Sequence, residues 1–174
     1  VSVADFAAQA VAARMLEEAF PGEALVGEEG SGDLQSEDGS RVLAQVVSFV
    51  QRILPKAEPE QVLSWLDKGG ATPGKFFWTL DPVDGTKGFL RGEQYAVALA
   101  YVADGIVQLG VLGCPNMGLE EGKLHSRDGV LLMAARGYGA WASSSITGED
   151  FKPLKVSGVS DPSQARILRS YESG

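Results

Sequence analysis

The chain has 174 residues, and 44% of them are hydrophobic, which is enough for one sizeable core. Acidic side chains outnumber basic ones by 23 to 15, and the net charge of −8 argues against a nucleic-acid partner, because such partners need a basic patch. A single cysteine, Cys114, excludes a disulfide framework, and no apolar run is long enough to span a membrane. These features predict a cytoplasmic, intracellular protein with no membrane or nucleic-acid partner.

The first part of the chain is dominated by helical patterns. Ser2 can cap a helix that runs to about Phe20, where a Pro-Gly pair stops it, and Asp5 lies in its first turn. The next predicted elements are a short strand at 24–26, a polar loop at 30–40, a helix over 42–54, a short helix at 60–66 and a loop at 69–74.

The second part of the chain reads mostly as β-strands. The dipeptide Asp104-Gly105 is typical of a hairpin turn between two strands. The predicted strands cover 76–80, 95–102, 106–112, 129–136, 139–141, 152–156 and 166–168. Helices followed by hairpin-connected strands predict an α+β domain, in which an antiparallel sheet packs with two main helices.

The most informative segment follows the apolar run 76–80. It reads Asp81-Pro82-Val83-Asp84-Gly85-Thr86. Pro82 and Gly85 oppose a helix, so a strand end followed by a tight turn is expected. In such a turn Asp81, Asp84 and a backbone carbonyl can converge on one hard cation, and the free N–H groups after it suit a phosphate oxygen. A plain Asp-Pro-x-Asp-Gly surface turn fits the same spacing, so local sequence leaves both readings open.

The flanking residues extend this segment into a longer pattern. It resembles the signature of the lithium-sensitive, magnesium-dependent phosphomonoesterases that include inositol monophosphatase and fructose-1,6-bisphosphatase. The continuation from Lys87 to Gln94 is similar to the 3'(2'),5'-bisphosphate nucleotidase branch, whereas inositol monophosphatases usually carry Thr-Asn-Phe after Asp-Gly-Thr. Further matching segments are 3–9, 26–29, 110–116 and 136–140. The resemblance covers nearly the whole chain and is weakest between Gly30 and Gly74.

The resemblance implies a metal site with two or three Mg²⁺ ions when complete. Glu28 and Asp81, together with the Val83 carbonyl, would contact the first ion, and Asp81 and Asp84 would contact the second. Two metals about 3.5–4 Å apart can activate a water and stabilise a leaving oxygen. Several carboxylates are needed to hold them, since hard cations prefer anionic oxygen.

The resemblance also implies which residues act on substrate. Gly85 and Thr86 would hold phosphate oxygens through backbone N–H groups. Asp5 would pair with Thr86 to activate the attacking water. Without the resemblance, Asp5 is simply an acidic residue favoured by the dipole at a helix N-terminus. Glu29 is expected to be an outer neighbour of the ligands, and His125, the single histidine, to be a solvated loop residue.

The implied activity is Mg²⁺-dependent hydrolysis of the 3'-phosphate of adenosine 3',5'-bisphosphate to AMP and phosphate, with 3'-phosphoadenylyl sulfate as a second substrate. Two alternatives stay open: an inositol (poly)phosphate 1-phosphatase, and a catalytically silent domain that binds metal or a partner. Complete members carry a second, C-terminal α/β domain, which we expect to be absent from this chain. Residues 1–174 are then one N-terminal metal-binding domain, whose partner is the missing half and which is inactive alone.

Overall fold

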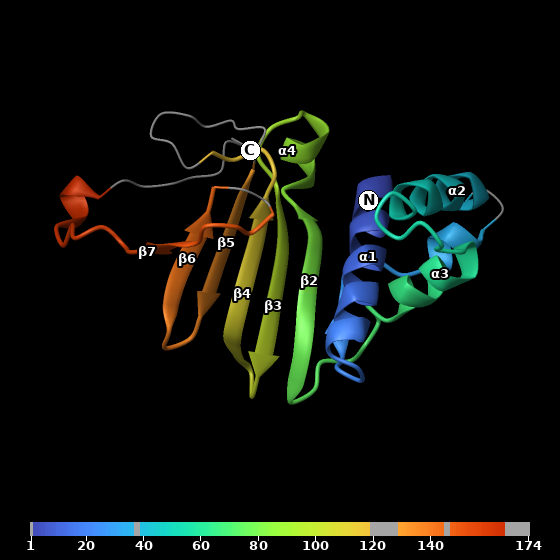
Figure 1. Ribbon diagram of the computed structural model, residues 1–174, viewed down its shortest axis with the longest axis horizontal. Helices are drawn as coiled ribbons and strands as arrows, with labels where there is room; N and C mark the ends of the chain where they lie inside the picture. Colours follow the sequence, from blue (N-terminus) through green and yellow to red (C-terminus); the bar gives the residue numbers. More distant parts are fainter. Residues whose placement is uncertain (1, 37–38, 119–128, 145–146, 166–174) are drawn as a thin grey trace.

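The computed structural model describes residues 2–36, 39–118, 129–144 and 147–165. Within these residues, helices pack against one end of a seven-stranded sheet whose strands lie in chain order (Figure 1). The helical elements are α1 (Val3–Ala19), η1 (Gly32–Gln35), α2 (Gly39–Val50), α3 (Pro59–Asp67), α4 (Thr86–Leu90) and η2 (Pro162–Gln164). The strands are β1 (Leu25–Val26), β2 (Phe76–Asp84), β3 (Ala96–Ala103), β4 (Ile106–Cys114), β5 (Val130–Ala135), β6 (Gly139–Ser143) and β7 (Lys152–Leu154).

The α+β class is confirmed, and the sheet is antiparallel except at its first pair. β2 to β7 pair antiparallel, whereas β1 runs parallel to β2. A parallel pair needs a long crossover connection, and the segment carrying η1, α2 and α3 supplies it. The hairpin turn at Asp104 and Gly105 is confirmed, with both residues at positive φ (51° and 74°).

Helix boundaries follow the capping signals closely. Ser2 is the N-cap of α1, and its hydroxyl accepts a hydrogen bond from the Ala4 N–H. α2 spans Gly39–Val50, whereas the apolar repeat predicts a helix over 42–54. The helix therefore begins earlier than predicted, and the residues after Val50 form turns. The 30–40 loop contains the 3₁₀ turn η1.

Two predictions concern residues that the structure does not describe. They are the strand at 166–168 and the loop position of His125.

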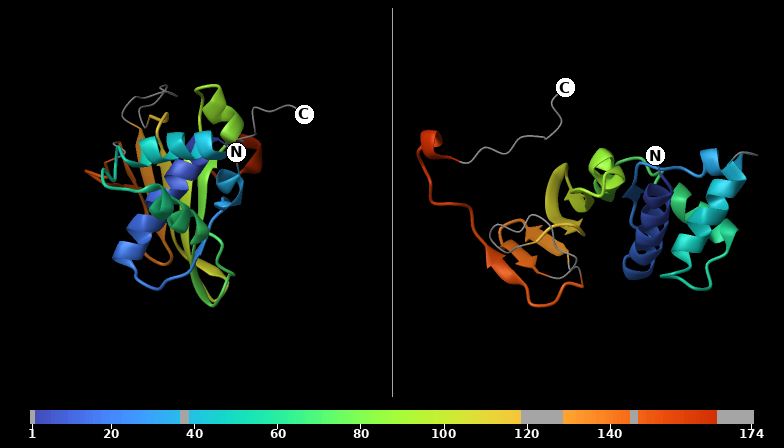
Figure 2. Two further views of the ribbon diagram at one scale, coloured as in Figure 1. Left: turned by 90° about the vertical axis from the view of Figure 1, so that its right-hand side faces the viewer. Right: turned by 90° about the horizontal axis from the view of Figure 1, so that it is seen from above.

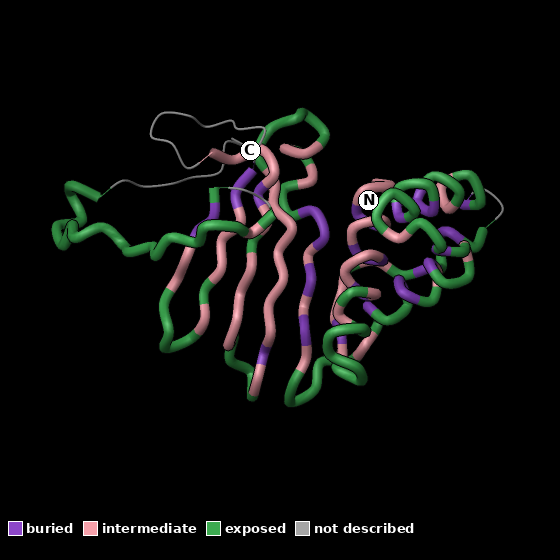
Figure 3. Tube along the Cα trace, in the orientation of Figure 1, coloured by how far each residue is buried: buried purple, intermediate pink, exposed green. Residues whose placement is uncertain are grey.

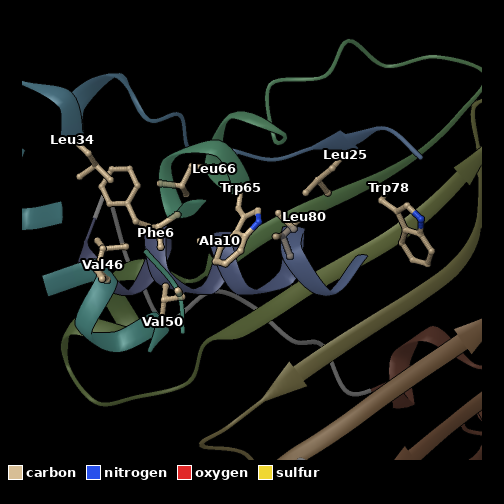
Figure 4. Packing of buried hydrophobic residues seen from close by; sticks show 14 residues of the cluster. Phe6, Ala10, Leu25, Leu34, Val46, Val50, Trp65, Leu66, Trp78 and Leu80 are labelled. Atoms are coloured by element: carbon tan, nitrogen blue, oxygen red, sulfur yellow. The ribbon is translucent and has the colours of Figure 1, made fainter. Parts of the chain in front are cut away.

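The core lies between the helices and the β1–β2–β3 end of the sheet. Figure 4 shows Phe6 and Ala10 of α1 packed among residues of α2, α3 and β2. Trp78 on β2 contacts the rings of Phe20 and Tyr101, with centroids 5.1 and 5.0 Å away. α3 contributes Trp65 and other buried residues, so it belongs to the helical layer alongside α1 and α2.

The far end of the sheet is less buried. Burial is concentrated on the helices and β2, while β3 to β6 are mostly half-buried and β7 is exposed (Figure 3). Seen from above, the helices and the last strands lie at opposite ends of the curved row of strands (Figure 2). An open hollow of ≈ 470 Å³ is lined mainly by apolar residues of β2 to β7. No helix among the described residues is long and apolar enough to cross a membrane.

Candidate active site

The Asp81–Thr86 segment joins β2 to α4 and departs from regular pairing. Asp81 pairs with Ala98 and Asp84 with Ala96, so the register shifts between them. The predicted irregularity therefore lies inside the last residues of β2 rather than in a separate turn. The Asp81 carboxylate accepts a hydrogen bond from the Val83 N–H at 3.1 Å, which holds the shifted backbone.

Gly85 connects this irregular strand end to α4. Its φ of 87° lies in the left-handed region, which favours glycine because a Cβ would clash there. α4 begins at Thr86, with Gly85 as its N-cap. The first N–H groups of a helix have no intrahelical acceptor, so this junction presents backbone donors. A hollow of ≈ 350 Å³ lies beside Asp84 and Gly85.

The Val83 carbonyl is engaged within the same segment. It accepts a hydrogen bond from the Thr86 hydroxyl at 3.1 Å. A carbonyl oxygen has two lone pairs, so one acceptor position of Val83 is used by this contact. The Thr86 hydroxyl therefore faces Val83, and no hydrogen bond between Thr86 and Asp5 is formed among the described residues.

Asp5 is buried in the first turn of α1 and takes part in a capping box. Its Oδ2 accepts hydrogen bonds from the Ser2 N–H at 2.6 Å and the Ser2 hydroxyl at 2.7 Å. Only 3% of Asp5 is exposed. Both bonds use one oxygen, so Oδ1 lies outside the capping box. The helix-dipole role expected for Asp5 is thus present, and it leaves a second function possible.

Glu28 lies in the loop after β1, and a residue that sequence reasoning missed holds this loop. Gln9 of α1 accepts hydrogen bonds from the N–H groups of Glu28 and Glu29, both at 3.0 Å. Gln9 sits one helical turn after Asp5, on the buried face of α1. That spacing was the available signal, because a polar residue on the buried face of a helix needs partners.

Carboxylates from three segments influence one another. Burial raises the pKa of Glu28, and the charges of Asp81, Asp5 and Asp84 raise it further. Burial also raises the pKa of Asp81, opposed by the hydrogen bond from Val83 and reinforced by Asp84 and Asp5. These like charges lie close enough to disfavour ionisation, a pattern typical of functional sites.

The carboxylates are neighbours without forming a closed set of ligands. Among the described residues, no three His, Cys, Asp or Glu side chains are placed to hold one metal ion together. Glu29 is half-buried, and burial followed by the Asp5 charge raises its pKa. Cys114 is buried near Asp84, and burial with this charge raises the pKa of its thiol, consistent with an inert core residue.

The whole chain matches a single family model. The model describes the inositol monophosphatase family and matches residues 1–173. The chain belongs to the inositol monophosphatase family. This confirms the superfamily that the Asp81–Thr86 segment and its flanks resemble.

Two curated relatives carry the name of the branch indicated by the Lys87–Gln94 continuation. The 3'(2'),5'-bisphosphate nucleotidase 1 of Candida albicans is 35% identical over 196 aligned residues, covering 100% of this chain and 53% of the relative. The 3'(2'),5'-bisphosphate nucleotidase 1 of Arabidopsis thaliana is 36% identical over 191 aligned residues, covering 99% of this chain and 54% of the relative. The chain thus spans about half the length of the curated relatives it matches.

A solved structure is also similar to this chain. It is an IMPase/NADP phosphatase complexed with NADP and Ca²⁺, with a TM-score of 0.45 and 19% identity. The alignment covers 82% of this chain and 38% of that chain.

Proposed function

We propose that this family member, together with a C-terminal half, hydrolyses the 3'-phosphate of adenosine 3',5'-bisphosphate to AMP and phosphate with Mg²⁺ as its cofactor. The observation that carries the proposal is the meeting of carboxylates from α1, the loop after β1 and the end of β2. Their charges raise the pKa values of Glu28 and Asp81. The names of the relatives favour a nucleotide bisphosphate as substrate.

The donor set fits Mg²⁺ in kind, since it consists of hard oxygen atoms. Glu28, Asp81 and the Val83 carbonyl would hold one ion, and Asp81 with Asp84 another, in a complete site of two or three. Bound ions would offset the charge on the phosphoryl oxygens and lower the pKa of a coordinated water. The mutual repulsion of these carboxylates makes a cation favourable at this place.

The chain's own groups would bind the phosphate and orient water. The backbone N–H groups of Gly85 and Thr86 would donate to phosphate oxygens at the start of α4, beside the ≈ 350 Å³ hollow. Asp5, through the oxygen outside its capping box, and Thr86 would orient the attacking water and receive its proton. For this, the Thr86 hydroxyl has to turn away from the Val83 carbonyl. The Val83 carbonyl keeps its second lone pair for a cation in either arrangement.

Release of phosphate tests the proposal. Adenosine 3',5'-bisphosphate, 3'-phosphoadenylyl sulfate and inositol 1-phosphate would each be incubated with the full-length enzyme, with and without Mg²⁺. We expect Mg²⁺-dependent release from the first two substrates, with AMP as the product of the first in chromatography. Preference for inositol phosphates would instead support the alternative inositol (poly)phosphate 1-phosphatase.

Assays of the chain 1–174 by itself test the second alternative, the catalytically silent domain. We expect weak metal binding and no measurable turnover, because one carboxylate of the second metal site and the closure of the cleft would come from the other half. Robust Mg²⁺-dependent turnover by residues 1–174, free of contaminating phosphatase, would contradict the expectation that the site needs a second half. Metal binding without turnover in the full-length enzyme would support a catalytically silent domain.

A further inference from the structure

The Gln9 side chain uses its whole hydrogen-bonding capacity inside the protein. It is fully buried, with 0% of the residue exposed. Its Oε1 accepts from the N–H groups of Glu28 and Glu29, and its Nε2 donates to the carbonyls of Glu29 and Leu66. A carboxamide offers two acceptor and two donor positions, and here each has a partner. One side chain thus ties α1 to the loop after β1 and to α3.

Two glycines make room for this carboxamide. A Cβ at Gly27 would lie 2.5 Å from the Gln9 Oε1, and a Cβ at Gly69 would lie 2.5 Å from its Nε2. Neither glycine has a positive φ, so space rather than backbone conformation requires glycine at both positions. The Gly27 N–H also donates to the Gly69 carbonyl at 2.8 Å, which closes the cage around the amide.

The hydrogen bonds of Gln9 are important for Glu28, because among the described residues no other side-chain hydrogen bond holds Glu28 in place. Among the described residues, no hydrogen bond or ion pair holds the Glu28 carboxylate, which is exposed. Its backbone N–H, in contrast, is bound by Gln9 at 3.0 Å. Holding the backbone fixes the point from which the Glu28 side chain extends, and the charges of Asp81 and Asp5 act on its carboxyl group.

We propose that Gln9 is a positioning residue that holds the Glu28 backbone so that its carboxylate reaches the metal site. The inference rests on the proposed function, in which Glu28 is a metal ligand. Leucine has a similar size but neither donors nor acceptors, so Gln9→Leu removes the hydrogen bonds and leaves two backbone N–H groups unpaired. Groups that orient a ligand typically change metal affinity about 10- to 100-fold when they are lost.

The test measures the Mn²⁺ affinity of the full-length enzyme by electron paramagnetic resonance, together with its melting temperature. Val50→Ala is the matched control, because Val50 is also 0% exposed but lies in α2. We expect Gln9→Leu to weaken Mn²⁺ binding about tenfold relative to Val50→Ala, measured well below both melting temperatures. Equal Mn²⁺ affinity in the two variants would show that Gln9 only supports the fold and would overturn the inference.

A double variant distinguishes action through Glu28 from a general effect. If Gln9 acts through Glu28, then Gln9→Leu combined with Glu28→Gln binds Mn²⁺ no more weakly than Glu28→Gln alone. Losses that multiply would overturn the inference. A full-length Glu28→Gln variant that keeps full Mn²⁺ affinity, or a full-length wild-type enzyme that binds none, would instead overturn the proposed metal site itself.

A milder change covers the case in which Gln9→Leu does not fold. Gly69→Ala places a methyl group 2.5 Å from the Gln9 Nε2 and 3.1 Å from the Leu66 carbonyl oxygen. Gly74→Ala is its control, since a Cβ there meets only the Phe76 carbonyl oxygen at 4.0 Å. We expect weaker Mn²⁺ binding for Gly69→Ala than for Gly74→Ala, and equal binding would overturn the inference.

Discussion

The two segments that present the carboxylates are held in different ways. The end of β2 is organised by contacts within six residues: Asp81 accepts from the Val83 N–H, and the Thr86 hydroxyl donates to the Val83 carbonyl. The loop after β1 is held from outside, by Gln9 of α1. The difference teaches that Asp81 and Asp84 keep their geometry through local sequence, whereas Glu28 depends on helices packing correctly.

The largest expected effect comes from the locally organised segment. Asp81→Asn keeps the side-chain volume but removes the charge, and Asp81 is the residue proposed to contact both metals. We expect Mg²⁺ or Mn²⁺ binding, measured by calorimetric titration, to weaken about a hundredfold or more, as for loss of a ligand rather than of an outer neighbour. Glu29→Gln is the comparison, with a smaller loss of about tenfold, as for an outer neighbour of the ligands. Equal losses in the two variants would mean that the ligand assignment is wrong.

The next effect concerns catalysis by Thr86, which belongs to the locally organised segment, and Asp5, which lies on α1, the helix that holds the loop after β1. In the full-length enzyme, Asp5→Asn and Thr86→Ala should each lower kcat about a hundredfold, a typical contribution of proton transfer by a positioned group. Circular dichroism should show an unchanged fold. The double variant should lose little beyond the worse single one, because groups that act in one step are non-additive. Two losses that simply multiply would show that the residues do not share a role.

A change of pH should alter metal affinity and stability through carboxylates of both regions. The pKa values of Glu28 and Asp81 are raised, so metal affinity should begin to fall, on acidification, at a higher pH than for ordinary carboxylates. The stability of the metal-free protein should change in the opposite direction and increase on acidification. A carboxyl group whose pKa is raised by folding contributes stability below its unfolded-state pKa, and this contribution is lost as pH rises through its folded-state pKa. Mn²⁺ titrations and thermal melts from pH 4 to 8, spanning roughly the affected range, check both trends.

The Asp81→Asn variant tests the stability trend separately from metal binding. Removing its charge relieves the repulsion on Glu28, so the metal-free variant should melt at a higher temperature than the wild type near neutral pH. A lower melting temperature would argue that the hydrogen bond from Val83 to the ionised carboxylate outweighs the repulsion.

The smallest effect tests the capping box that holds Asp5. Ser2→Ala removes the hydroxyl that accepts from Ala4 and donates to Asp5. We expect the free energy of unfolding to fall by about 1 kcal/mol, the usual effect of losing an N-cap side chain. Urea denaturation measures it. A loss of metal affinity as large as that in Asp81→Asn would indicate that the cap, rather than the carboxylates, organises the site.

Local signals in the sequence determined much of this protein. The Ser2 cap, the Asp104-Gly105 turn and the alternating strands depend on near neighbours, so their positions were predictable. A break in regular structure near Asp81 was also predictable, because Pro82 and Gly85 restrict the backbone directly, but it lies inside the end of β2 and not in a separate turn. The family resemblance likewise rests on contiguous residues and is confirmed.

Tertiary structure alone decided how the separate segments meet. The parallel pairing of β1 with β2 depends on the crossover through α2 and α3, and no residue of β1 encodes it alone. The Gln9 bridge joins positions far apart in sequence, because a buried amide takes whichever backbone groups the packed helices bring to it. By contrast, the Thr86 hydroxyl donates within its own turn, to the Val83 carbonyl, so this contact is local and does not depend on how α1 packs.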